Sequence, residues 1–378
     1  MEALPTPDEL RLSHPLLWNE EDQEVLQSSS TKKIYRILDD MDDDSNWLDE
    51  KVWSANRAVF PETVQFNNDQ TYPCFSQDGF AWALAIVTSR SVFVDGSSRL
   101  IPILDFANHD DVGVEEVQGG TMGTFGTTKG ARLRAGPGRT YLSGDEVYSS
   151  YGPKSAADYL LDHGFIPEFA RSMRKNVAEL TFEVEKGDIF HDDKLDILEF
   201  ETYDSAPMEP VQKFDVVSEI GNDEEPDPAM IQFLRLAKLG AKDAFLLESI
   251  FRKEVWEFMA YPVSQPNERD IVDTVADTCN KALEGMKVVE GDDGEHGDTP
   301  LDLCAIVRES ESKALKRTLE FVTREKEALD LKEYYQERRL KDLGLDSEWN
   351  PEDDDGSDPY ADEDLGFGQS RAPGSLDW

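Results

Sequence analysis

The sequence predicts an α+β fold in which a part that mixes helices with strands precedes an all-helical part. The main observation is a change of hydrophobic period, from glycine-rich alternating segments in residues 113–151 to helically spaced apolar residues after residue 229. The length of 378 residues also favours two domains. We therefore expect domains at residues 1–182 and 229–345, joined by an acidic connection at residues 183–228.

The first part is predicted to begin with helices and to end with strands. Apolar residues recur with helical spacing from Leu16 to Trp53, and the dense apolar run from Gly79 to Arg90 predicts a helix buried on most sides. Residues 100–106, with the sequence LIPILDF, have the length of a buried strand that opens into a polar loop. Residues 113–151 are typical of β-hairpins, with a Ser-Gly-Asp turn at residues 143–145.

The predicted connection and the C-terminal tail are both acidic. Between Phe182 and Pro228, 16 acidic residues face 3 lysines and no arginine, and no long amphipathic period appears. From Asp346 to Asp364 there are ten acidic residues without a lysine or arginine. A segment of this composition cannot bury enough apolar surface to fold, so we expect residues 346–378 to be disordered.

The second part is predicted to be a set of helices. Residues 229–260 are densely apolar, and an apolar face follows a helix start at Asn267. Thr299 followed by Pro300 is typical of a capped helix start. We expect that helix to pass into another that ends at Gly344.

The charge balance excludes some classes of partner. There are 38 lysine and arginine residues against 80 acidic ones, a formal net charge of −42. Binding to nucleic acid or to an anionic membrane needs clustered cations, so we expect neither. The longest apolar run, Phe80 to Val87, is far shorter than the roughly 20 residues of a membrane-spanning helix. No targeting segment is recognised, so cytoplasm is the default, with chloroplast and nucleus left open; the sequence leaves the oligomeric state unknown.

Several common types of catalytic or metal site are also excluded. The three cysteines are far apart and form no CxxC pair, and no histidines stand at HExxH spacing, so we expect no metal site. The chain lacks the phosphate loop GxxxxGK[ST] and the nucleophile motif GxSxG. Gly136-Pro137-Gly138 is not a dinucleotide fingerprint because it contains proline and precedes a predicted strand.

Two short stretches remain as candidates for chemistry. The first is DFANH at residues 105–109, and the second is SSYGPKS at residues 149–155, which leads into DYLLDHGF at residues 158–165. Taken singly, each has a structural explanation: a turn after a strand, a half-buried tyrosine and a glycine at a helix C-terminus. In order, with the helix ending at Arg90 before them and the helical part after them, they resemble the SET-domain protein methyltransferases, and most closely the Rubisco large-subunit methyltransferase group.

This resemblance implies a cofactor and a set of site residues. The cofactor is S-adenosylmethionine, which Asn108 and His109 would hold together with Arg90, a residue at the junction of the cofactor and substrate pockets. Asp105 matches the acid beside the target-residue channel, and Tyr151 matches the tyrosine at the point of methyl transfer. Displacement of a sulfonium methyl group by an amine needs in-line alignment more than acid–base groups, so such a set is chemically reasonable.

The chain departs from the family pattern in three places. His163 stands where the family commonly has tyrosine, so it is a candidate substrate-binding residue or a packing residue. Asp110 follows the Asn-His pair where serine is usual. No Gly-x-Gly stretch precedes Leu16, so we expect a partial SET domain that comprises the helical insert and the C-terminal part, without the N-terminal strands.

The functional hypothesis is a protein-lysine N-methyltransferase, with histidine as an alternative acceptor. The acidic surface favours a protein substrate whose target lies in a basic segment. The alternative is a non-catalytic SET-like protein-binding module, or a truncated product, that has lost cofactor binding. A role as an acidic histone-binding protein rests on charge alone.

Overall fold

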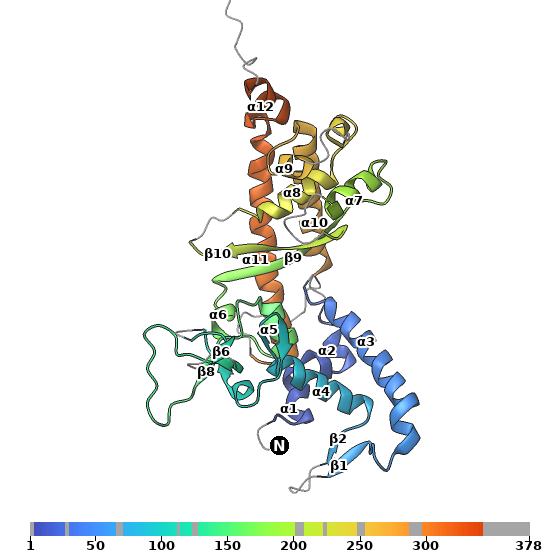
Figure 1. Ribbon diagram of the computed structural model, residues 1–378, viewed down its shortest axis with the longest axis vertical. Coiled ribbons are helices and arrows are strands. Elements are labelled where there is room, and N and C mark those ends of the chain that lie inside the picture. The colour runs from blue at the N-terminus through green and yellow to red at the C-terminus, as the bar shows by residue number, and fades with distance from the viewer. Residues whose placement is uncertain are drawn as a thin grey trace, which may run out of the picture.

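The computed structural model describes residues 4–26, 30–65, 71–111, 114–122, 128–200, 208–221, 225–247, 254–286 and 297–342. Two bodies are stacked along the long axis of the molecule, with the N-terminal body at the bottom of Figure 1 and the C-terminal body at the top. A two-stranded sheet, β9–β10, lies at the side of the C-terminal body that faces the N-terminal body, and one long helix, α11, runs through both. The α+β fold class is confirmed.

The N-terminal body contains short strands and six α-helices among its described residues. The helices are α1 (Pro7–Ser13), α2 (Glu20–Gln23), α3 (Lys33–Leu48), α4 (Gln77–Arg90), α5 (Ala156–His163) and α6 (Glu168–Arg171). The strands are β1 (Thr63–Gln65), β2 (Thr71–Pro73), β3 (Val92–Val94), β4 (Ser97–Arg99), β5 (Asn108–His109), β6 (Gln118–Met122), β7 (Thr128–Arg132) and β8 (Tyr148–Ser149). A 3-10 turn at Leu104–Phe106 precedes β5.

The C-terminal body combines the β9–β10 pair with helices. Its elements are β9 (Lys175–Glu183), α7 (His191–Phe200), β10 (Val211–Glu219), α8 (Pro228–Ala237), α9 (Val255–Phe258), α10 (Gln265–Gly285), α11 (Pro300–Glu327) and α12 (Tyr335–Asp342). The two strands are antiparallel over their full length, from Lys175 opposite Glu219 to Glu183 opposite Val211.

Helix α11 belongs to two hydrophobic cores. Leu303 and Ile306, in its first turns, pack into a core with α4, α5 and the N-terminal residues, whereas Leu315 and Val322 pack into a core with β9, β10, α8 and α10. At 1.5 Å per residue, its 28 residues extend over about 42 Å. The helix therefore ties the two bodies together.

Side-chain caps mark the starts of α10 and α11. The predicted start of α11 is confirmed, because the Thr299 hydroxyl accepts from the backbone N–H of Asp302 and the Asp302 carboxylate accepts from that of Thr299. Helix α10 starts earlier than predicted: Ser264 caps it by accepting from the backbone N–H of Asn267, which lies in the first turn.

The predicted strand at residues 100–106 is wrong. Those residues form a turn and the 3-10 helix, and Ile103 has a φ of 80° and is 77% exposed. A β-branched residue at positive φ cannot continue a strand. Residues 139–152 do not form a hairpin either, since β8 instead pairs in parallel with β5, Asn108 opposite Tyr148.

The structure of residues 183–228 differs from the predicted acidic connection. Residues 183–228 contain α7 and β10, and Ile197, Leu198 and Val216 are buried in the second core. Most acids among the described residues of this segment are exposed, so the composition resembles that of a linker. At the other end, α11 stops at Glu327, a short break follows, and α12 begins at Tyr335. Gly344 and the acidic tail lie outside the described residues.

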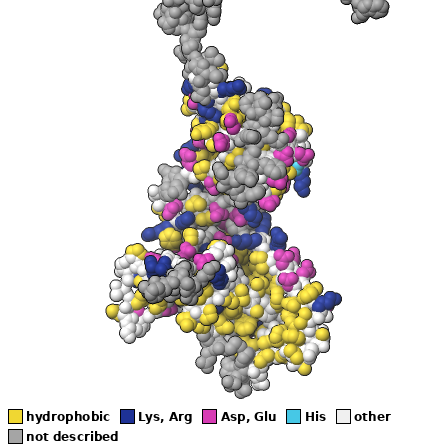
Figure 2. Space-filling view, viewed as in Figure 1, with side chains coloured by type: hydrophobic (Ala, Val, Ile, Leu, Met, Phe, Trp, Pro, Cys, Tyr) yellow, Lys and Arg dark blue, Asp and Glu magenta, His cyan; other side chains and the backbone are white. Residues whose placement is uncertain are grey.

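The surface differs between the two bodies. Figure 2 shows hydrophobic side chains gathered over the lower part of this face, where Figure 1 places α1, α3 and α4. Exposed apolar residues of the N-terminal body include Leu12, Trp47, Val59 and Phe93. None of the described helices has both the length and the apolar composition needed to cross a membrane.

Candidate functional site

A cavity of about 370 Å³ lies in the N-terminal body, within the usual size range of small-molecule sites. Its walls come from the end of α4, the loop before β5, the segment after β8 and the end of α5. Four of the six predicted site residues line it: Arg90, Asp105, Tyr151 and His163. These residues span positions 90 to 163, so only the fold brings them together.

Tyr151 is fixed in the wall by hydrogen bonds at both ends. Its hydroxyl donates to the carbonyl of Ala107 at 3.0 Å, and its backbone N–H donates to Nδ1 of His109 at 3.2 Å. Burial raises the pKa of the Tyr151 hydroxyl, and the nearby Arg90 charge only partly opposes this. The hydroxyl is therefore neutral at physiological pH, and its oxygen lone pairs remain available to a ligand.

His109 supports Tyr151 from behind and does not line the cavity. Its side chain is only 2% exposed, and its Nε2 lies 2.7 Å from a carboxylate oxygen of Asp111. Because Nδ1 accepts from Tyr151, the ring proton resides on Nε2 and is donated to Asp111. The rings of His109 and Tyr151 are 5.0 Å apart. His109 thus positions the tyrosine.

Asn108 also lies outside the cavity wall. It is exposed, and its side-chain nitrogen donates to Glu146 at 2.6 Å. Its backbone is part of β5, which pairs in parallel with β8. From β8 the chain continues to Tyr151. Asn108 and His109 are therefore absent from the cavity wall, although His109 contacts Tyr151 from outside it.

Arg90 is the last residue of α4 and forms one edge of the cavity. Its Nη1 donates to the backbone carbonyl of Asp105 at 2.9 Å, and its guanidinium lies 5.6 Å from the ring centre of Phe106. A cation at a helix C-terminus is also favoured by the helix dipole. Arg90 consequently holds the loop that carries Asp105 against the helix.

Two buried polar atoms on the cavity residues have no hydrogen-bond partner within the described part of the chain: Oδ1 of Asp105 and Nε2 of His163. The other ring nitrogen of His163 lies 3.1 Å from the carbonyl oxygen of Ser89. Burial, together with the charge of Lys154, lowers the pKa of His163 to about 4. Its ring is therefore neutral at physiological pH.

Sequence reasoning missed an ion pair at the cavity. Lys154 and Asp162 both line it, with 2.5 Å between Nζ and Oδ2. They are eight residues apart, and helix periodicity predicts side-chain contacts at separations of three or four residues. The contact forms because Lys154 lies before α5 and its side chain reaches along the helix. Glu116 also lines the cavity and was not predicted. No group of three metal-ligating side chains occurs among the residues described.

Comparison with known proteins connects this geometry to one family. Residues 185–331 match the family model described as Rubisco LSMT substrate-binding. The ribulose-1,5-bisphosphate carboxylase/oxygenase large subunit N-methyltransferase of Nicotiana tabacum, a chloroplastic protein, is 34% identical over 357 residues, which cover 89% of this chain and 67% of the relative. The chloroplastic fructose-bisphosphate aldolase-lysine N-methyltransferase of Arabidopsis thaliana is 31% identical, over 87% of this chain and 66% of the relative. The chain thus spans about two thirds of these proteins.

Solved structures agree with the sequence comparison. The SET domain of LSMT bound to lysine and AdoHcy superposes with a TM-score of 0.71 and 28% identity, over 91% of this chain and 74% of that one. Rubisco LSMT bound to AdoMet superposes with a TM-score of 0.69 and 28% identity, over 90% and 74% of the two chains. The similarity extends through both bodies.

Proposed function

Since the chain belongs to the SET-domain protein methyltransferases of the Rubisco large-subunit methyltransferase group, we propose that it transfers a methyl group from S-adenosylmethionine to a lysine side-chain nitrogen of a protein substrate. One observation carries the proposal: Arg90, Asp105, Tyr151 and His163, which the sequence resemblance assigned to the site, line one cavity. The similarity to active lysine methyltransferases favours this over a non-catalytic binding module.

The residues present fit the cofactor in kind. The cavity is of small-molecule size, and the unpartnered acceptor atoms of Asp105 and His163 suit a ligand with N–H and O–H groups. Arg90 would contact the cofactor from the cavity wall. Asn108 and His109 would act from β5. The backbone of β5 would contact the cofactor, and His109 would hold Tyr151 in place.

The chemistry is a displacement in which the nitrogen–methyl bond forms as the sulfur–methyl bond breaks. Bound S-adenosylmethionine supplies the methyl group on a positively charged sulfur. The protein has to align the amine with that bond and exclude water. Tyr151 suits this task because its hydroxyl proton is held by Ala107, so its oxygen presents lone pairs that favour polarised C–H and N–H groups.

Substrate recognition is assigned to the C-terminal body. Residues 185–331 match the substrate-binding family model, and we place the partial SET domain at residues 1–182. Rubisco and fructose-bisphosphate aldolase, the proteins that the relatives modify, are the first substrates to test. A basic segment around the target lysine would complement the negative charge of the chain. The chloroplastic relatives favour a plastid over the cytoplasmic default, which a fluorescent fusion would test.

The test is methyl transfer from labelled S-adenosylmethionine to purified Rubisco, purified aldolase and a plastid extract, with the labelled residue identified by tandem mass spectrometry. Label on lysine supports the proposal, whereas label on histidine would show that the acceptor is the alternative, histidine. Absence of label in all three substrates with a folded protein would contradict it.

A further inference from the structure

A groove rich in cations lies at the end of the C-terminal body. Helix α12 lies at that end, away from the N-terminal body (Figure 1). The groove beside it has a volume of about 460 Å³, and its walls hold three cations against one acid, Glu333. The cations are Arg338, Arg339 and Lys341, and the aromatic members of the wall are Phe258, Tyr261 and Tyr335. The groove is therefore locally positive, although the formal net charge of the chain is −42.

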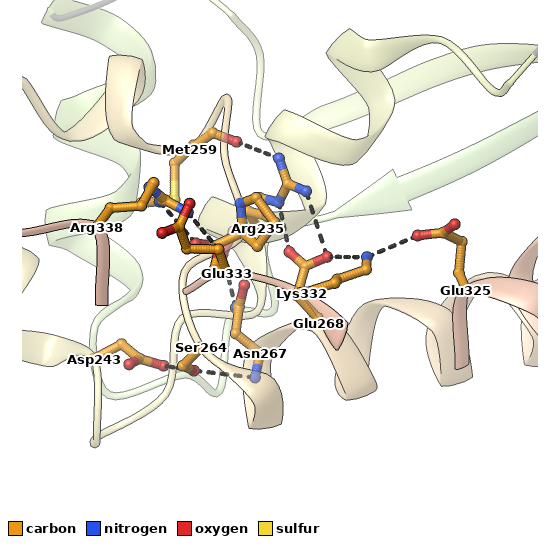
Figure 3. A network of polar contacts seen from close by, with 11 residues as sticks. Arg235, Asp243, Met259, Ser264, Asn267, Glu268, Glu325, Lys332, Glu333 and Arg338 are labelled. Carbon is orange, nitrogen blue, oxygen red and sulfur yellow. Dashed lines mark hydrogen bonds and ion pairs between the residues drawn. The ribbon is translucent and has the colours of Figure 1, made fainter. Parts of the chain in front are cut away.

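Arg338 is fixed in the groove by bonds that do not involve a carboxylate. Its Nη1 donates to the backbone carbonyl of Glu333 at 2.6 Å (Figure 3), and its Nη2 donates to that of Pro262 at 2.9 Å. These bonds use two of the five N–H donors of a guanidinium. Within the described ranges, no carboxylate forms an ion pair with Arg338. Its position is thus set by the backbone, and its charge is available to an anionic ligand.

The groove also exposes apolar surface. Tyr261 is 61% exposed, and the guanidinium of Arg338 lies 5.3 Å from its ring centre. Behind it, the ring of Tyr335 packs on that of Phe258, with 5.3 Å between the ring centres. Leu340 of α12 is 46% exposed. A ligand that combines carboxylates with an aromatic or aliphatic side chain would satisfy both features of this surface.

The end of the chain has this composition. Residues 346–364 contain ten acids and no lysine or arginine, together with Trp349 and Tyr360. Asp346 follows four residues after Asp342, the last described residue, and Lys341, one residue earlier, already lines the groove. Four extended residues reach up to about 14 Å. The acidic segment is therefore attached directly beside the groove.

We propose that residues 346–364 bind in the groove beside α12 of their own chain, with carboxylates at Arg338 and Lys341 and an aromatic side chain on Tyr261. A segment tethered by a few residues has an effective concentration of about millimolar, so individually weak surface ion pairs suffice to hold it. Such an internal ligand would exclude acidic segments of other proteins from this end of the C-terminal body. The inference does not depend on methyl transfer.

The experiment titrates a fluorescent peptide of residues 346–364 into two full-length proteins at low ionic strength. One is the wild-type chain, and the other carries the amides Asn and Gln in place of the ten acids of the segment. We expect the peptide to bind the neutralised protein, and to bind the wild-type chain about tenfold more weakly, because the tethered segment competes with it. Equal binding to both proteins, or no binding to the neutralised protein, would overturn the proposal.

Hydrogen exchange separates the chain's own segment from that of a second copy. We expect slower exchange of α12 in the wild-type chain than in the neutralised protein, by the same factor at low and at high protein concentration. A difference that grows with protein concentration would assign the groove to a second copy and overturn the proposal, as would equal exchange in the two proteins.

Variants of the neutralised protein test the position of the groove. Arg338→Gln should weaken peptide binding about two- to fivefold, the effect of one surface ion pair. Lys341→Gln, at an exposed lysine, is the second variant if Arg338→Gln loosens α12. Arg36→Gln, the control, removes the same charge from an exposed position on α3 and should leave binding unchanged. Unchanged binding by folded Arg338→Gln and Lys341→Gln proteins would overturn the proposal.

Discussion

Tyr151 and Tyr159 differ in position although their hydroxyl groups make equivalent bonds. Each donates to a backbone carbonyl, Tyr151 to Ala107 at 3.0 Å and Tyr159 to Gly152 at 2.9 Å, but only Tyr151 lines the cavity. We predict that Tyr151→Phe lowers kcat for methyl transfer by about 10²-fold, the typical effect of removing one polar group aimed at a reaction centre. Tyr159→Phe, the matched control, should retain kcat within a few-fold. Equal losses in steady-state assays would show that the site assignment is incorrect.

The order of the sequence motifs predicted four residues that line the cavity, but not the contacts that hold them there. Arg90, Asp105, Tyr151 and His163 were all identified from sequence, and the structure gathers them. The supporting position of His109 was not predictable, because it depends on the parallel pairing of β5 with β8. Strands of two residues, such as β5 and β8, are too short to show a periodic pattern in the sequence.

A buried ionic network connects elements of the C-terminal body. Figure 3 shows Glu268 of α10 between Arg235 of α8 and Lys332, which follows α11. The Glu268 carboxylate accepts from Nε of Arg235 at 2.6 Å and from Nζ of Lys332 at 2.8 Å, and its side chain is only 3% exposed. Burial alone would raise the pKa of Glu268, but its hydrogen bonds and charge interactions with both cations outweigh this and lower the pKa.

Glu268→Gln should therefore destabilise the protein and weaken its response to acid. Removing one partner of a buried ion pair costs about 3–5 kcal/mol. Because the folded state holds the pKa of Glu268 below its ordinary value of 4.5, its stabilisation is present above that pH and is lost as pH falls through the lowered value. The measurement is urea unfolding of both proteins from pH 7 to pH 3.

The control is Asp273→Asn, on the same helix. Asp273 pairs with Lys326 of α11 at 2.6 Å, but both side chains are about half exposed, so its loss should change the free energy of unfolding by no more than about 1 kcal/mol. If Glu268→Gln behaved like this control, the network would have no structural importance.

Periodicity predicted the long elements and failed for the irregular ones. The dense apolar run of residues 79–90 predicted α4, the apolar face after Asn267 predicted α10, and the Thr299 cap predicted the start of α11. Residues 100–106 were predicted as a strand because composition alone cannot report the positive φ of Ile103. Acidic composition likewise concealed β10, where only alternate residues are buried.

At the scale of the whole molecule, α11 joins the two cores, so we expect them to unfold as one cooperative unit. We predict that Leu315→Ala, in the second core, costs about 2–5 kcal/mol and also speeds hydrogen exchange of α5 in the first core. Leu301→Ala provides a control at the exposed start of the same helix. Faster exchange confined to α8 and α10 would mean that the two bodies unfold independently.

The central claim is that the cavity beside Arg90 and Tyr151 is a cofactor site, and calorimetric titration with S-adenosylhomocysteine tests it most directly. We predict binding of one molecule per chain with a micromolar Kd, weakened about tenfold or more by Arg90→Ala, as expected for loss of a charged hydrogen-bonding group. Arg11→Ala, which changes an exposed arginine on α1, should leave the Kd unchanged. Absence of binding by the folded chain, or equal binding by the Arg90→Ala variant, would contradict the account.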